Sequence, residues 1–207
     1  MEIKDISEVT VILRGHSYEI VRNICLAVKE TQHIRNLEIT MNTPDALTII
    51  SKISKEFEES LNIGAGTVTT LQQAIQAIEA GAKFLLSPTV MKKSIVDYAS
   101  EKKVITVSGA FSPTEILEAC ENKCDIIKIF PASAVSKSYF RDLKGPLGDF
   151  PIMAVGGVNK SNAKEYFERG AKYIGLSGIF SKDSIKENDF NKILKDCEEF
   201  ERLVYNE

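Results

Sequence analysis

The feature that most restricts the fold of this sequence is a repeat in which a short apolar run precedes a longer amphipathic segment. Eight such cycles follow one another at a period of roughly 20 to 26 residues. The short runs are rich in Val, Ile and Leu and nearly continuous, which is typical of strands buried on both faces. They occupy residues 9–13, 37–40, 61–64, 84–87, 104–107, 125–130, 152–155 and 173–176.

The intervening segments have helical patterns. Leu71, Ala74 and Ile78 recur at three- and four-residue steps, and Gly81 is expected to end that helix. A second amphipathic helix is predicted over 185–204. Cap residues, three of them followed by a proline, predict helix starts at 43–44, 87–88, 112–113 and 161–162.

Alternating strands and helices indicate an α/β protein with a parallel sheet. Eight units in a row predict a closed (β/α)8 TIM barrel, for which 207 residues is short. No linker or low-complexity tract divides the chain, so we expect one domain over residues 1–207. The rival is a doubly wound open sheet, but the chain has no Gly-x-Gly-x-x-Gly, the fingerprint of dinucleotide binding in such sheets.

Charge and hydropathy limit the partners. The net charge is −3, with 43% apolar and 27% charged residues, which is ordinary globular composition. A weakly acidic chain gives no electrostatic reason to bind nucleic acid. No apolar run approaches the roughly 20 residues needed to cross a bilayer, and no secretion signal is visible. We therefore expect a cytoplasmic protein with neither membrane nor nucleic-acid partners.

Metal and histidine chemistry are disfavoured. The chain has two histidines and four cysteines, with no Cys-x-x-Cys or His-x-x-x-His spacing. We therefore expect neither a metal site nor a His-centred hydrolase. If the protein is an enzyme, Lys, Asp, Glu or backbone groups must carry the chemistry.

Two charged residues lie inside the apolar strands. Lys128 shares a strand face with Ile126 and Phe130, and Glu38 lies between Leu37 and Ile39. In a barrel interior, desolvation would favour a neutral, nucleophilic amine and a carboxyl group that exchanges protons near neutral pH. The alternatives are a lysine that extends past the strand end and a glutamate in a structural ion pair.

The ends of the predicted strands carry further candidates, because barrel active sites lie at the carboxyl ends of the strands. Arg14 follows the first strand and could grip a carboxylate through two hydrogen bonds, unless it is simply solvated. Thr67 follows a Gly-Ala-Gly turn at 64–66, where glycines would let a ligand approach the backbone. An ordinary tight turn with Thr69 or Thr70 capping the next helix is the alternative.

The last two strands end in glycine-rich turns. Gly156 and Gly157 follow the seventh strand, and Ser177 and Gly178 follow the eighth. In many (β/α)8 enzymes these two loops bind phosphate through backbone N–H groups. We therefore expect a phosphorylated ligand.

The combined motifs resemble the 2-keto-3-deoxy-6-phosphogluconate / 4-hydroxy-2-oxoglutarate aldolase family over nearly the whole chain. They occur in order at the predicted strand ends: Leu-Glu-Ile-Thr at 37–40, Gly-Ala-Gly-Thr-Val at 64–68, Gly-Ala-Lys-Phe at 81–84, Ser-Pro at 87–88, Lys-Ile-Phe-Pro at 128–131 and Gly-Gly-Val at 156–158. Each motif alone is weak, and the set is specific.

The resemblance implies a homotrimeric class I aldolase that needs no cofactor. It would reversibly cleave a phosphorylated 2-keto-3-deoxy sugar acid to pyruvate and glyceraldehyde 3-phosphate. Lys128 matches the Schiff-base lysine and Glu38 the acid/base. The residues expected to bind substrate are Arg14, Thr67, Pro88, Phe130, Val155, Gly156, Gly157, Ser177 and Gly178.

The chain also departs from the gluconate-type pattern. Asn42 stands where many members carry an Arg, and Arg14 ends the first strand instead. Val155 replaces a Thr before Gly-Gly, and Ser108 replaces a common Pro. The pattern is closer to the phosphogalactonate aldolases, so the C4 epimer stays open. A 4-hydroxy-2-oxoglutarate aldolase, another phosphate-binding barrel such as an isomerase or transferase, and a sugar-phosphate sensor without turnover are the alternatives.

Overall fold

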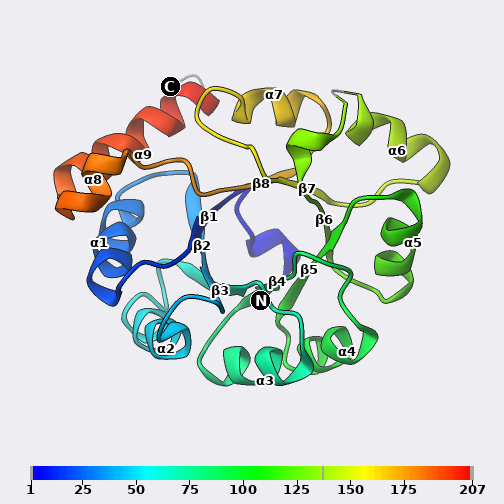
Figure 1. Ribbon diagram of the computed structural model, residues 1–207, viewed down its shortest axis with the longest axis horizontal. Helices are drawn as coiled ribbons and strands as arrows, with labels where there is room; N and C mark the ends of the chain where they lie inside the picture. Colours follow the sequence, from blue (N-terminus) through cyan, green and yellow to red (C-terminus); the bar gives the residue numbers. More distant parts are fainter. Residues whose placement is uncertain (1, 137, 206–207) are drawn as a thin grey trace.

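Eight parallel strands form a closed barrel in sequence order, β1 to β8, and helices surround it (Figure 1). This computed structural model describes residues 2–136 and 138–205, so residues 1, 137, 206 and 207 of the predicted domain lie outside the described part. The strands are β1 Val9–Leu13, β2 Ile34–Thr40, β3 Asn62–Gly66, β4 Phe84–Leu86, β5 Ile105–Ala110, β6 Ile126–Ile129, β7 Ile152–Val155 and β8 Tyr173–Leu176. The closed barrel confirms the predicted (β/α)8 fold and excludes the open sheet.

The helices follow the strands in turn. They are α1 Tyr18–Lys29, α2 Ala46–Glu56, α3 Leu71–Glu79, α4 Lys93–Glu101, α5 Pro113–Glu121, α6 Tyr139–Leu147, α7 Ala163–Glu168, α8 Lys182–Glu187 and α9 Phe190–Tyr205, with 3-10 turns η1 Ile3–Asp5 and η2 Ala132–Ala134. Among the described helices, none is both long and apolar enough to cross a membrane.

Strand alternation divides the apolar residues into two cores. One set of side chains points outward and packs under the helices; the other fills the barrel. The inner set is Ile6, Ile12, Phe84, Leu86, Ile105, Val107, Ile126, Met153, Val155 and Tyr173. Because Lys128 is two residues from Ile126 and two from Phe130, its position faces the barrel interior.

The N-terminal segment closes the amino end of the barrel. Figure 1 shows η1 in blue at the far side of the ring, across the barrel axis. Asn36 donates a hydrogen bond to the Ser7 carbonyl (2.8 Å), and Asn62 donates one to the Asp5 carbonyl (2.9 Å). Ile6 is buried among the inner side chains. Side chains thus fill the amino end of the barrel, and space for a ligand is left at the carboxyl end.

Several local predictions are confirmed. Ser112 caps α5 with a reciprocal contact to Glu115, and Thr70 caps α3 in the same way with Gln73. Gly81 follows α3 at φ +102°, in the left-handed region that ends many helices.

Other boundaries differ. Residues 64–66 belong to β3 rather than to a turn, and the pair 87–88 starts no helix, because α4 begins at Lys93. The start predicted at 43–44 falls short of α2, which begins at Ala46. The predicted helix over 185–204 is two helices, separated at Asn188, which has a left-handed backbone (φ 49°).

A glycine in β3 gives a test of the inner packing. A methyl group on Gly64 would overlap the ring of Phe84, which is 1% exposed and cannot retreat. We expect Gly64→Ala to lower the free energy of unfolding by about 1–3 kcal/mol, as overpacked cores do. The matched control is Gly145→Ala in α6, where nothing lies within 4 Å of the new methyl group. It should be neutral or stabilising, by about 0.5–1 kcal/mol at most. Urea unfolding of both variants checks the difference, and equal midpoints would contradict it.

Candidate active site

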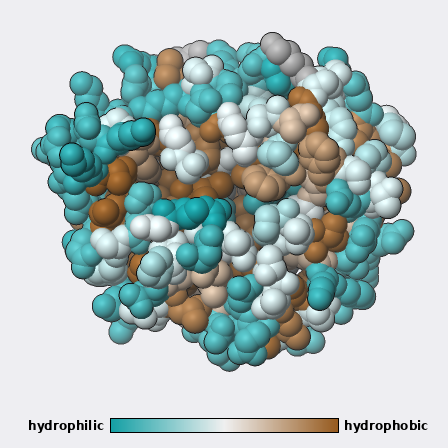
Figure 2. Space-filling view, in the orientation of Figure 1, coloured by the Kyte–Doolittle hydropathy of each residue, from teal (hydrophilic) through white to brown (hydrophobic). Residues whose placement is uncertain are grey.

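A cavity of about 330 Å³ opens at the carboxyl ends of the strands. Figure 2, viewed from this side, shows hydrophobic and hydrophilic residues together at the centre of the face. The cavity is lined by Ile12, Arg14, His16, Glu38, Thr67, Pro88, Lys128, Phe130, Val155, Gly156, Gly157, Val158, Gly175, Leu176 and Ser177. Every site residue predicted from the sequence is in this set except Gly178, which pairs instead with Asn159 in a parallel bridge.

Lys128 and Glu38 are the two buried charges of the cavity. The exposed fraction is 5% for Lys128 and 2% for Glu38. Burial lowers the pKa of the Lys128 amine, with Arg14 acting in the same direction and the Glu38 charge opposing it. Burial raises the pKa of the Glu38 carboxyl against the attraction of Lys128 and Arg14. Both shifts favour the neutral forms, in which the amine is a nucleophile and the carboxyl can donate a proton.

The glycines of β3 make room for the carboxylate. Glu38 pairs with Gly64 in the register of β2 and β3, and a methyl group on Gly66 would overlap the Glu38 side chain. Glu38 Oε2 is buried and has no hydrogen-bond partner among the described residues. An unpartnered buried carboxyl oxygen facing a cavity is free to bond a substrate or water.

Lys128 is surrounded by an aromatic ring and by the backbone of two neighbouring segments. Its Nζ lies 4.9 Å from the centre of the Phe130 ring. In the sheet it pairs with Gly109 of β5, and a methyl group on Gly109 would come within 2.4 Å of the Pro88 carbonyl carbon. The segment after β4 therefore crosses directly over β5 beside the lysine, which explains why Pro88 lines the cavity.

Arg14 and Asn42 are partners rather than alternatives. Arg14 Nη1 donates to Asn42 Oδ1 at 2.8 Å on the exposed rim of the cavity. The adjacent Gly15 N–H donates to the Thr43 hydroxyl at 2.9 Å, so the loop after β1 is tied to the loop after β2. This pairing holds the guanidinium near the cavity, within electrostatic reach of both Lys128 and Glu38.

The loop after β7 requires glycine. Gly156 and Gly157 have φ values of +95° and +78°, where side chains are strained. A methyl group on Gly157 would also lie 2.5 Å from Ser133 Cβ. The Gly156 carbonyl accepts from the Ser133 N–H (3.0 Å), and the Gly157 carbonyl accepts from the Asn162 amide (2.9 Å). The loop is thus fixed with its bare backbone beside the cavity.

His16 lines the cavity, although the sequence did not single it out as a candidate. It is partly buried, and burial lowers the pKa of its imidazole. The sequence feature that could have identified His16 is its position two residues after Arg14 at a strand end, in a chain with only two histidines. Among the described residues, no group of three or more His, Cys, Asp or Glu side chains could hold a metal ion.

The sequence matches the family model "KDPG and KHG aldolase" over residues 2–196. The chain therefore belongs to the KDPG and KHG aldolase family, and it is an aldolase, a carbon–carbon lyase.

Named relatives agree with this assignment. A probable 2-dehydro-3-deoxy-6-phosphogalactonate aldolase of Rhizobium meliloti is 33% identical over 179 residues, which cover 86% of this chain and 84% of the relative. The KHG/KDPG aldolase of Escherichia coli is 29% identical over 164 residues, 78% of this chain and 76% of the relative. The structure of a KDPG aldolase from Legionella pneumophila, with pyruvate captured as a covalent carbinolamine, superposes with a TM-score of 0.82 at 25% identity and 92% coverage of both chains.

Thr67 carries backbone strain at the cavity. Its φ of 58° is left-handed, which is a costly conformation for a β-branched residue. We expect Thr67→Gly to raise the free energy of unfolding by roughly 1 kcal/mol. Lys123→Gly, at φ 65° outside the cavity, is the matched control and should also stabilise. Thermal unfolding measures both variants; a loss of stability only in Thr67→Gly would mean that side-chain contacts outweigh the strain.

Proposed function

We propose that the protein is a class I aldolase that forms an imine on Lys128. The substrate is a 6-phosphorylated 2-keto-3-deoxy sugar acid, and the products are pyruvate and D-glyceraldehyde 3-phosphate. The observation that carries the proposal is the burial of both Lys128 and Glu38 in one cavity, because burial favours the neutral amine that attacks a ketone.

In the proposed reaction, the Lys128 amine adds to the C2 ketone and gives a carbinolamine. Glu38 transfers protons, directly or through water, so that the C2 hydroxyl leaves as water and a protonated imine forms. Removal of the C4 hydroxyl proton then breaks the C3–C4 bond, and the electron pair of that bond moves into the imine. The aldehyde leaves, the resulting enamine is protonated at C3, and water releases pyruvate from Lys128.

The rest of the cavity suits the two ends of such a substrate. Arg14, held by Asn42 at the rim, and Thr67 would bind the carboxylate. The loops after β7 and β8 would bind the phosphate through backbone N–H groups of Gly156, Gly157 and Ser177, which line the cavity, and of Gly178, which follows Ser177 just outside it. Pro88 and Phe130 would form the wall beside the reacting carbons.

For the C4 configuration, we favour the galactonate epimer. Val155 is 4% exposed and lines the cavity, and its side chain has no hydroxyl to bond a substrate hydroxyl. A probable phosphogalactonate aldolase is 33% identical to this chain over 179 residues.

We also propose that the protein is a homotrimer, as the resemblance implies, and that it is located in the cytoplasm. Light scattering in solution tests the homotrimer, because it compares the mass of the particle with the 23.0 kDa of one chain.

The Schiff base can be trapped. Borohydride in the presence of pyruvate should reduce the imine and attach one adduct to Lys128, identified by peptide mass spectrometry. Lys128→Met should lose both adduct and activity. Glu38→Gln should still form the adduct, but turnover should fall by about 10²–10⁴-fold, the usual contribution of general acid–base catalysis.

A second lysine serves as the control for trapping. Lys83 Nζ donates to the Glu58 carbonyl (2.6 Å) and lies outside the cavity. Lys83→Met should keep the adduct and the activity. A wild-type protein that cleaves substrate while Lys128 stays unmodified would overturn the mechanism.

The epimer preference has its own test. In a coupled pyruvate assay we expect the wild type to prefer 2-keto-3-deoxy-6-phosphogalactonate. Val155→Thr adds a hydroxyl at nearly constant volume, and it should shift the ratio of kcat/KM toward the gluconate epimer by about 2–10-fold, the value of one hydrogen bond. Val155→Ala, which adds no hydroxyl, should not produce this shift. Preference for 4-hydroxy-2-oxoglutarate over both epimers would replace the proposed substrate.

A further inference from the structure

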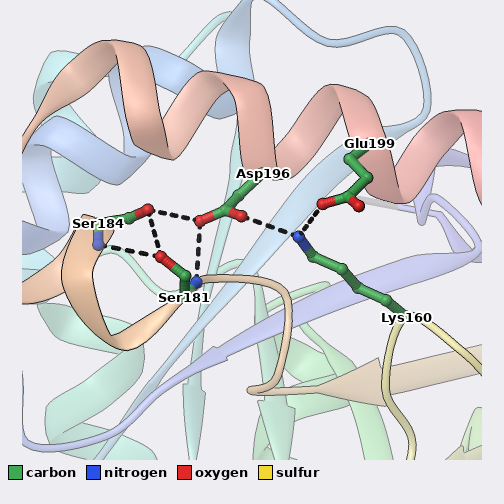
Figure 3. Close-up of polar contacts among 5 residues, drawn as sticks. All are labelled: Lys160, Ser181, Ser184, Asp196 and Glu199. Carbon is green, nitrogen blue, oxygen red and sulfur yellow. Dashed lines mark hydrogen bonds and ion pairs between the residues drawn. The ribbon is translucent and has the colours of Figure 1, made fainter.

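A polar cluster joins α9 to the loops after β7 and β8. Figure 3 shows Asp196 and Glu199 pointing from α9 toward Lys160, with Ser181 and Ser184 beside Asp196. Lys160 follows β7, and Ser181 follows β8 and caps α8. We call these five residues the α9 cluster.

Asp196 is the centre of the α9 cluster. Its Oδ1 accepts from Lys160 Nζ at 2.8 Å. Its Oδ2 accepts from the Ser181 backbone N–H at 2.8 Å and from the Ser184 hydroxyl at 2.7 Å. One carboxylate therefore binds both loops, whereas Glu199 contacts only Lys160 within the cluster, at 2.7 Å.

The charges of the cluster are partly removed from water. The side chain of Asp196 is 13% exposed and that of Lys160 is 21% exposed. Burial opposes ionisation of Asp196, but the bonds from Lys160, Ser181 and Ser184 outweigh it and lower the pKa of the carboxyl. Burial likewise opposes the charge on Lys160, and Asp196 and Glu199 raise its pKa. The pair is thus ionised at neutral pH, and a charge-assisted contact of this kind is stronger than a neutral one.

Short chain segments connect the α9 cluster to the cavity. Lys160 is three residues after Gly157, and Ser181 is three residues after Gly178. Between them, Asn159 pairs with Gly178 in a parallel bridge, and its amide donates to the Gly157 carbonyl at 3.2 Å. We therefore expect movement of Lys160 or Ser181 to displace Gly157, which lines the cavity, and Gly178, which is joined to it through Asn159.

We propose that Asp196 is a positioning residue, which holds the loops after β7 and β8 at the separation at which their backbone binds the substrate phosphate. The inference rests on the proposed function, since it needs a phosphate between these loops. Asp196 touches no reacting atom, and its effect is confined to the phosphate-bearing half of the substrate.

The same helix offers a matched control. Glu201 of α9 is 6% exposed and accepts from the backbone N–H groups of Gln32, His33 and Ile34 at 3.1, 2.5 and 3.2 Å. Like Asp196, it ties α9 to backbone N–H groups. Unlike Asp196, it bonds to residues 32–34 at the amino end of β2, which belong to neither of the loops after β7 and β8. We therefore expect loss of Glu201 to weaken the docking of α9 and to leave the bonds of Asp196 to Lys160 and Ser181 in place.

The test compares two aldehydes in the synthetic direction, with pyruvate as the second substrate. Asp196→Asn should raise KM for D-glyceraldehyde 3-phosphate roughly tenfold, which corresponds to about 1.4 kcal/mol, with kcat within about twofold. The rate with unphosphorylated D-glyceraldehyde should stay near the wild-type value. Lys160→Met should have the same selective effect, and inorganic phosphate should inhibit both variants more weakly than the wild type.

The outcomes separate this inference from the proposed function. Glu201→Gln should lower the unfolding temperature and leave the ratio between the two aldehydes unchanged. Equal losses with both aldehydes in Asp196→Asn and Lys160→Met, or the same selective loss in Glu201→Gln, would overturn the positioning role. If Asp196→Asn does not fold, Lys160→Met alone decides. Failure of pyruvate trapping in the wild type would instead overturn the proposed function.

Discussion

The burial of Lys128 and Glu38 inside the barrel is the constraint on which the rest of the structure depends. The charges of two buried ionisable groups must be balanced against each other, and their neighbours must leave space for a ligand. Glycines supply that space: Gly66 admits the Glu38 side chain, and Gly109 admits the segment that carries Pro88 over β5. Apolar residues fill the barrel below, and η1 closes its amino end, so the charges face the cavity at the carboxyl end.

The fold could be predicted from the sequence because eight buried strands leave eight apolar runs at a regular spacing. The two charges could be found for the same reason, since a lysine or glutamate is costly inside a buried strand and contrasts with its apolar neighbours. The hydrogen bond between Arg14 and Asn42 could not be predicted, because it joins two loops whose bonded residues are 28 positions apart in the sequence. The break at Asn188 also escaped prediction, because the apolar pattern of the two final helices continues across a residue with a left-handed backbone.

The last helix does more than cover the barrel. It contacts α1, α7 and α8, and two of its carboxylates reach backbone N–H groups of distant segments. Glu201 bonds to residues 32–34 at the amino end of β2, and Asp196 bonds to the loops after β7 and β8. The (β/α)8 pattern requires only that α9 cover apolar surface, so no periodicity in the sequence distinguishes these two residues from the other acidic side chains of the helix.

The closed amino end of the barrel has a consequence for the order of events. With Ile6 and the bonds of Asn36 and Asn62 across that end, the cavity at the carboxyl end is the passage for whatever enters and leaves. In the proposed reaction one product stays covalently attached to Lys128 at the inner end while the other lies toward the opening. The aldehyde must then be released before pyruvate, and in the synthetic direction pyruvate must bind before the aldehyde. The covalent bond to Lys128 and the single described opening together make product release and substrate binding ordered.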